Sequence, residues 1–181
     1  MKQSEYIKVF IRSNRKAIRF FLFFVLLFVV GQALYNFVYP LTLPYLVHKF
    51  NAEAGSMIIN LITPDEKSFV QERAIRSGRF LLQIGWGCEG TEGMLILLAG
   101  IWAFQMSIKR KLLGSLIGVL ILYIFNLIRI VVLYYLLKYK PDVFDLTHIY
   151  IGQIFLILIA FIFFIWWTSR FGEDDGKDIS E

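Results

Sequence analysis

The chain is 181 residues long, 57% of its residues are hydrophobic, and its formal net charge is +5. The hydrophobic residues gather into long runs, which indicates a membrane protein and excludes an ordinary soluble domain. Basic residues flank these runs, so the positive charge reflects membrane topology, and we expect no nucleic-acid partner. The length fits a single membrane domain, 1–181.

A helix that crosses a membrane needs about 20 predominantly apolar residues. Four segments meet or approach this requirement: 19–38, 91–107, 112–137 and 149–168. The chain is therefore predicted to be an all-α integral membrane protein, built as a bundle of four transmembrane helices. The second segment is the shortest of the four, and Gln105 lies near its end.

Basic residues at the ends of the spans predict the orientation, because they favour the cytoplasmic side. Six lie at or before the start of the first span, and three lie in the turn between the second and third spans: Lys2, Lys8, Arg12, Arg15, Lys16 and Arg19, then Lys109, Arg110 and Lys111. We therefore expect both termini in the cytoplasm, including the acidic tail 171–181. The long loop 39–90 is expected on the outer side.

The long outer loop is predicted to contain a helix and a small β-hairpin. Pro40 and Pro44 predict a turn. Residues 45–63 then carry apolar side chains at helical spacing, as in an amphipathic helix that lies on the outer membrane surface. Two strand-like runs, 69–75 and 79–84, flank an Arg-Ser-Gly turn and form the predicted hairpin.

Three residues with reactive side chains are predicted to lie at one depth near the outer surface. Cys88 is the only cysteine and opens the second span, and His148 begins the fourth. Arg129 lies 17 residues beyond Leu112, about 25 Å into a hydrocarbon core of about 30 Å. An arginine inside a membrane usually faces a bundle interior or a wet cavity. Topology gives the three groups a common depth, but it does not establish their lateral contact.

A thiol, a guanidinium and an imidazole together suit nucleophilic catalysis. A nearby cation or a helix N-terminus lowers the pKa of a thiol, so Arg129 and the first turn of the second span are expected to activate Cys88. His148 is suited to moving the proton, and Arg129 is alternatively suited to stabilising an oxyanion. Each residue also has a structural interpretation: a buried cysteine, an arginine that reaches the headgroups, and a histidine that caps a helix.

Neighbouring residues are candidate substrate contacts. Asn126 precedes Arg129 by three residues and shares its helix face, and Gly90 leaves room for a substrate backbone. Glu89 lies beside the thiol, although solvated carboxylates that favour a helix N-terminus are the simpler interpretation for it and Glu92. One cysteine and two histidines are too few for a metal site, and no nucleotide-binding or serine-hydrolase motif is present. We expect no cofactor.

Three stretches of the chain together form a more specific signature: "GCEGTEGMLILLAGIWAF", "KRKLLGSLIGVLILYIFNLIRIVVLYYL" and "FDLTHIYIGQIFLILI". They resemble the exosortase/archaeosortase family of membrane cysteine proteases over roughly residues 83–167. The chain is most similar to the short exosortase H type, with a four-span core. The resemblance implies a catalytic triad of Cys88, Arg129 and His148. Glu89 departs from the family pattern, in which asparagine or serine is common at this position.

The resemblance also implies a substrate class and a location. Exosortases act in the bacterial inner membrane on secreted proteins whose C-terminal tail contains a short motif, a transmembrane helix and a basic cluster. Attack by Cys88 near the motif would give a thioester, which an unknown acceptor nucleophile or water then resolves. Membrane lipids are the other expected partners. From the residues alone, two other classes stay open: a non-catalytic assembly subunit and a small transporter, each using Arg129 to bind an acidic group or an anion.

Overall fold

The computed structural model describes residues 13–85 and 87–172, and most of this part of the chain is helical. The α-helices are α2 (Arg15–Leu43), α3 (Ala54–Ile62), α4 (Thr91–Ala103), α5 (Ile108–Tyr139), α6 (Phe144–Leu146) and α7 (Gly152–Phe171). Two π-helical segments join them, η1 (Pro44–Glu53) before α3 and η4 (Thr147–Ile151) before α7. The strands are β1 (Phe69–Gln71), β2 (Ala74–Ser77) and β3 (Phe80–Gln83). Short 3-10 turns occupy Pro64–Glu66 and Pro141–Val143.

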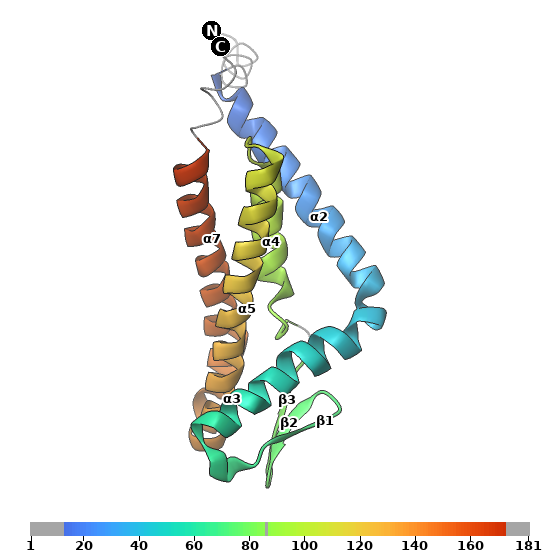
Figure 1. Ribbon diagram of the computed structural model, residues 1–181, viewed down its shortest axis with the longest axis vertical. Coiled ribbons are helices and arrows are strands. Elements are labelled where there is room, and N and C mark those ends of the chain that lie inside the picture. The colour runs from blue at the N-terminus through green and yellow to red at the C-terminus, as the bar shows by residue number, and fades with distance from the viewer. Residues whose placement is uncertain (1–12, 86, 173–181) are drawn as a thin grey trace.

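Four helices run along the long axis of the molecule, and α4 packs against the other three, α2, α5 and α7 (Figure 1). A core shared by α4, α5 and α7 contains Leu97, Leu122, Phe163 and Trp167. Only three of these helices, in the part of the chain that the structure describes, are long and apolar enough to cross a membrane: Arg15–Thr42, Ile108–Tyr139 and Gly152–Phe171.

The second predicted span, 91–107, is shorter than expected. Helix α4 has 13 residues, which extend over about 20 Å. It ends because Phe104 takes an extended backbone conformation, with φ −73° and ψ 145°, and the chain then turns into α5. Four helices are packed together, but the second falls short of the length that a lone membrane-spanning helix needs, so the predicted count of four transmembrane helices is not confirmed.

The turn predicted at Pro40 is wrong, because α2 continues through this residue to Leu43. A proline removes the hydrogen bond of its own amide but leaves later amides free to continue the helix. Helical backbone follows on both sides of Pro44, so the predicted helix 45–63 is part of a longer helical path. Figure 1 shows α2 leaning away from the other long helices and α3 crossing back beneath them.

The predicted two-stranded hairpin is instead a three-stranded antiparallel sheet in the order β1-β2-β3. The run predicted as one strand, 69–75, is divided because Glu72 takes a positive φ of 53° and forms a tight turn. The turn predicted around Gly78 is present, and this glycine also has a φ of 53°. Ile75 and Leu82 are paired on one face of the sheet and pack into a core that includes Leu133 of α5.

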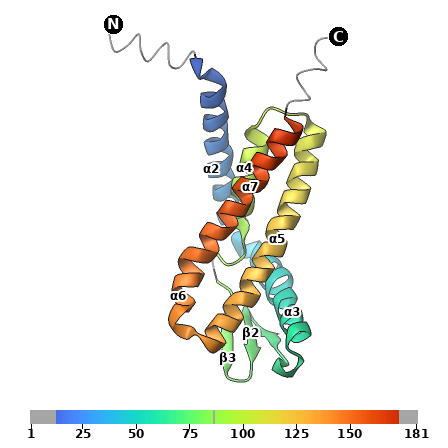
Figure 2. The same ribbon diagram turned by 90° about the vertical axis from the view of Figure 1, so that its left-hand side faces the viewer.

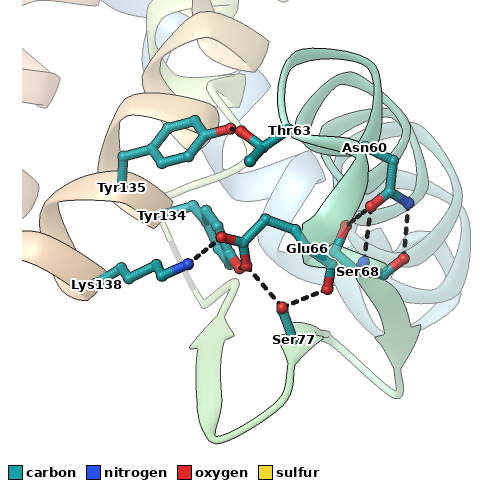
Figure 3. Close-up of polar contacts among 8 residues, drawn as sticks. All are labelled: Asn60, Thr63, Glu66, Ser68, Ser77, Tyr134, Tyr135 and Lys138. Carbon is teal, nitrogen blue, oxygen red and sulfur yellow. Dashed lines mark hydrogen bonds and ion pairs between the residues drawn. The ribbon is translucent and has the colours of Figure 1, made fainter.

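A polar cluster fastens the turn before the sheet to the far end of α5 (Figure 3). The Glu66 carboxylate accepts hydrogen bonds from the Tyr134 hydroxyl and the Ser77 hydroxyl, each at 2.7 Å, and forms an ion pair with Lys138. The hydrogen bond from Lys138, with those from Tyr134 and Ser77, lowers the pKa of Glu66 to about 2. The carboxylate therefore stays ionised at neutral pH and holds the sheet against the helix.

The start of α2 and the end of α7 lie at one end of the molecule, and the sheet lies at the other (Figures 1 and 2). The link between α4 and α5, next to the basic residues 109–111, is at the same end as these two helix termini. This arrangement agrees with termini on one side of a membrane. The basic segment 1–12 and all but the first two residues of the predicted tail 171–181 lie outside the described residues.

Candidate active site

Cys88 lies in a glycine-rich turn that connects β3 to α4. The turn needs left-handed backbone at two positions, Gly87 (φ 82°) and Gly90 (φ 76°), which favours glycine at both. The Cys88 amide donates to the Gly85 carbonyl at 3.1 Å, and Gly90 is the N-cap residue of α4. Only 4% of Cys88 is exposed. The thiol is thus held just before the helix, in a buried and locally fixed position.

The imidazole of His148 lies next to this thiol. Cys88 Sγ is 3.6 Å from both Nδ1 and Nε2 of His148, so either ring nitrogen is within reach of the sulfur. The ring also stacks on Phe144, four residues earlier, with centroids 5.4 Å apart and planes 6° apart. Phe144 therefore fixes the orientation of the ring. The sequence predicted a common depth for Cys88 and His148, and the structure places them in contact.

Arg129 joins the backbones that carry the other two residues. Its Nη1 donates to the Gly87 carbonyl at 3.2 Å, and its Nη2 donates to the His148 carbonyl at 3.1 Å. Only 7% of the arginine is exposed, so its charge acts at the site with little screening by water. The three predicted catalytic residues are therefore brought together, with the guanidinium bridging the cysteine turn and the histidine segment.

Gly152, the first residue of α7, makes room for this guanidinium. A Cβ atom added to Gly152 would lie 2.3 Å from Arg129 Nε and 3.1 Å from Cζ, which is closer than real Cβ atoms approach. The Nε atom is buried and has no hydrogen-bond partner in the described part of the chain. The sequence analysis did not single out Gly152. Its position four residues after His148, one helical turn away, was the available signal.

Asn126 of α5 binds the backbone of the turn that carries Cys88. It is fully buried, and its amide nitrogen donates to the Cys88 carbonyl at 3.0 Å and to the Asn51 side chain at 3.1 Å. A Cβ atom on Gly90 would lie 2.9 Å from Asn126 Cγ, so this glycine packs directly on the asparagine. Predicted as substrate contacts, Asn126 and Gly90 here contact each other and the catalytic turn.

Glu89 is buried, with 4% exposed, and the interpretation of a solvated carboxylate is therefore wrong for this residue. One oxygen accepts a hydrogen bond from the Gly87 amide at 3.0 Å, and the other accepts one from the Tyr39 hydroxyl at 3.1 Å. The carboxylate thus shapes the turn around Cys88 and attaches it to α2. Tyr39 lies 50 residues before Glu89, and no local pattern in the sequence connects them.

Burial controls the protonation of the thiol and the imidazole. It raises the pKa of Cys88 above its ordinary value; nearby Arg129 acts in the opposite direction and Glu89 in the same direction. It also lowers the pKa of His148, as does the charge of Arg129, while Asp145 opposes this shift. The predicted lowering of the thiol pKa is thus wrong for this state, because desolvation outweighs the guanidinium. At neutral pH the site holds a neutral thiol beside a neutral imidazole.

Within residues 13–85 and 87–172, no three histidine, cysteine, aspartate or glutamate side chains are grouped so that they could hold a metal ion. The arrangement instead contains the parts that acyl transfer requires. These are a nucleophile, a base in contact with it, and a fixed cation that joins the two segments carrying them.

The three residues of this site lie within a stretch of the chain that matches a known protein family. The family model described as transmembrane exosortase matches residues 8–165, which include Cys88, Arg129 and His148. No curated protein and no solved structure matches the chain.

Proposed function

The chain belongs to the transmembrane exosortase family, and on this premise we propose that it is a membrane cysteine peptidase or transpeptidase. Its substrates are secreted proteins that end in a short motif, a transmembrane helix and a basic cluster. One observation carries the proposal: the Cys88 thiol lies 3.6 Å from both ring nitrogens of His148, with Arg129 bound to the backbone of each segment. A structural cysteine needs no such partners.

The neutral resting pair supports general-base activation of the nucleophile. As Cys88 Sγ attacks the carbonyl carbon of the scissile peptide bond, its proton passes to His148, and the carbonyl electrons form an oxyanion. Collapse of this intermediate breaks the carbon–nitrogen bond, and His148 returns the proton to the leaving amine. The product is a thioester on Cys88. An acceptor nucleophile or water then attacks the thioester and frees the thiol.

Arg129 contributes a fixed positive charge to this sequence of steps. Its charge favours the thiolate that develops as the proton leaves Cys88, against the desolvation that disfavours it. The same charge keeps a second proton off the resting imidazole, because a cation nearby disfavours imidazolium. His148 is therefore available as a base at neutral pH. The hydrogen bonds of the guanidinium to the Gly87 and His148 carbonyls hold the segments that carry Cys88 and His148 next to each other.

The distribution of charge supports an orientation with the site on the outer side of the membrane, and the family suggests a bacterial inner membrane. Basic residues 109–111 lie at the end of the molecule opposite the sheet (Figure 1). Arg129 follows Lys111 by 18 residues, or about 27 Å of helix, which is close to the thickness of a hydrocarbon core. With the basic end in the cytoplasm, the thiol meets secreted substrates where they leave the bilayer.

Co-expression with tailed reporters tests the proposal. A panel of secreted reporters, each ending in a different proline-containing motif, a transmembrane helix and a basic cluster, is followed by immunoblot for loss of the tail. We expect cleavage with the native chain and background levels with Cys88→Ala and His148→Ala. Hydroxylamine, which attacks thioesters, should release a reporter fragment held on Cys88.

Cys88→Ala removes only the sulfur from a buried site, so its folding is checked by thermal unfolding in detergent. Cleavage that persists in a folded Cys88→Ala protein would refute the peptidase. Loss of a binding partner in Arg129→Ala, with no effect of Cys88→Ala, would instead identify a non-catalytic assembly subunit.

A further inference from the structure

The outer edge of β3 has no strand beside it. In the hairpin β2-β3, Leu82 pairs with Ile75 and Phe80 pairs with Ser77, and the Ile84 amide continues this ladder by donating to the Arg73 carbonyl. Backbone hydrogen bonds in antiparallel pairs alternate along a strand.

The residues between these bonded pairs, Leu81 and Gln83, therefore direct their backbone N–H and C=O groups away from β2. No hydrogen bond joins these groups to any residue in 13–85 or 87–172.

The opposite edge of the sheet is capped just before its first strand begins. Just before β1, the side-chain amide of Asn60 binds both backbone groups of Ser68: its oxygen accepts from the Ser68 amide at 2.7 Å, and its nitrogen donates to the Ser68 carbonyl at 2.8 Å (Figure 3). Asn60 thus occupies the place that another strand would take. Unprotected edges readily pair with other chains, and proteins usually block them. Here the cap lies at Ser68, before β1, and no such cap is found beside Leu81 and Gln83 in the described part of the chain.

The open edge also borders a groove on the outer face of the sheet. This groove has a volume of about 270 Å³ and is lined by Gln71, Glu72, Arg73, Ala74, Leu81 and Gln83. Leu81 is 46% exposed, and Gln83 is exposed as well. Alternate side chains of a strand added beside β3 would face this groove, so the edge offers backbone pairing together with a polar recess for side chains.

The edge leads directly to the candidate nucleophile, because Gln83 precedes Cys88 by only five residues. We propose that the outer edge of β3 binds the substrate by adding the extended segment next to the scissile bond as a fourth strand. This inference rests on the proposed function and names the recognition surface for that same site. The unpaired N–H and C=O groups select an extended polypeptide backbone, which lipid chains cannot supply.

Recognition through the backbone would depend little on the side chains of the bound segment. The hydrogen bonds at Leu81 and Gln83 would be made with any extended segment, and only the side chains facing the groove would be selected. Removing one of these bonds should therefore lower kcat/KM for every cleaved reporter by a similar factor, about five-fold.

Paired substitutions at one position isolate the backbone bond. Leu81→Pro removes the outward N–H, whereas Leu81→Ala shortens the side chain and keeps it; proline is tolerated on edge strands where the N–H faces outward. We expect about five-fold lower kcat/KM for Leu81→Pro than for Leu81→Ala, and the same difference between Gln83→Pro and Gln83→Ala. The rate of Cys88 alkylation should be equal within each pair, which shows that the site is intact.

A photo-crosslinker supplies a readout that does not depend on proline being tolerated. p-Benzoylphenylalanine at position 83 of the Cys88→Ala protein should crosslink to a tailed reporter, and the same group at position 69, on β1 at the opposite side of the sheet, should not. Equal kcat/KM within the pairs and no crosslink at position 83 would overturn the proposal. So would a crosslinked dimer of the chain at position 83 without reporter, since a second copy would then occupy the edge. Cleavage independent of Cys88 would instead overturn the proposed function.

Discussion

Replacing Gly152 by alanine should disable the candidate site although none of the three predicted catalytic residues is replaced. The new Cβ would lie 2.3 Å from Arg129 Nε, whereas non-bonded atoms pack at about 3.5–4.0 Å. The guanidinium must therefore move by about 1 Å, which breaks at least one of its bonds to the Gly87 and His148 carbonyls, now 3.2 and 3.1 Å long. A hydrogen bond from a charged donor contributes about 1.5–3 kcal/mol. A misplacement of about 1 Å in a catalytic group can lower the rate about 100-fold.

Reporter cleavage measures the loss of rate in Gly152→Ala, and thermal unfolding measures the loss of stability separately. Gly93→Ala is the matched control: it also adds a methyl group to a buried helical glycine, but its Cβ would lie at an ordinary 3.6 Å from Leu156 Cβ. We expect about 100-fold slower cleavage for Gly152→Ala and near-native cleavage for Gly93→Ala. Because both changes act on the same guanidinium, Gly152→Ala should cause little further loss in an Arg129→Ala background. Native cleavage by Gly152→Ala would refute the argument that this glycine positions the arginine.

Four further predictions concern protonation and the contacts that hold the sheet and α2. The rate of Cys88 alkylation should still be rising at pH 9, because burial raises the pKa of the thiol. Glu89→Gln should shift this pH–rate curve to lower pH, because it removes a carboxylate that disfavours the thiolate. An unshifted curve would contradict this role of Glu89. Tyr39→Phe should lower the free energy of unfolding in detergent by about 1 kcal/mol, because one hydrogen bond to Glu89 is lost. Lys138→Met should lower the free energy of unfolding at pH 7, because it leaves the Glu66 carboxylate without its cation. Since the pKa of Glu66 falls on folding from 4.5 to about 2, its contribution is complete above pH 4.5 and disappears as the pH falls to about 2. Urea unfolding at pH 7 and pH 3 should show a smaller difference in Glu66→Gln than in the native chain.

The long helices and the common depth of the catalytic residues could be predicted from the sequence. Runs of apolar residues define helices because the bilayer allows few other backbone structures. Counting 1.5 Å per residue from the basic turn then places Arg129 near the level of Cys88 and His148. This reasoning works because depth in a membrane depends on position along the chain, which the sequence gives directly.

The polar contacts that complete the site could not be predicted in the same way. Tyr39 and Glu89 are 50 residues apart, and Asn126 and Asn51 are 75 residues apart, so no local periodicity connects them. The sequence places Glu89 beside the nucleophile but does not show whether its carboxylate faces water or the protein. The raised pKa of the Cys88 thiol likewise depends on burial by several helices, which only the folded chain reveals.

The distribution of the triad along the chain has a consequence for biosynthesis. Cys88 is synthesised 60 residues before His148, and Arg129 precedes His148 by 19 residues. The ribosome has therefore made two long helices and the sheet before it makes His148. The hydrogen bond from Arg129 to the His148 carbonyl can form only when this last part of the chain lies beside the other helices. An unfinished chain carries a thiol with no partner to take its proton. On the proposed mechanism, the protein therefore becomes chemically competent only after the segment that carries His148 is in place.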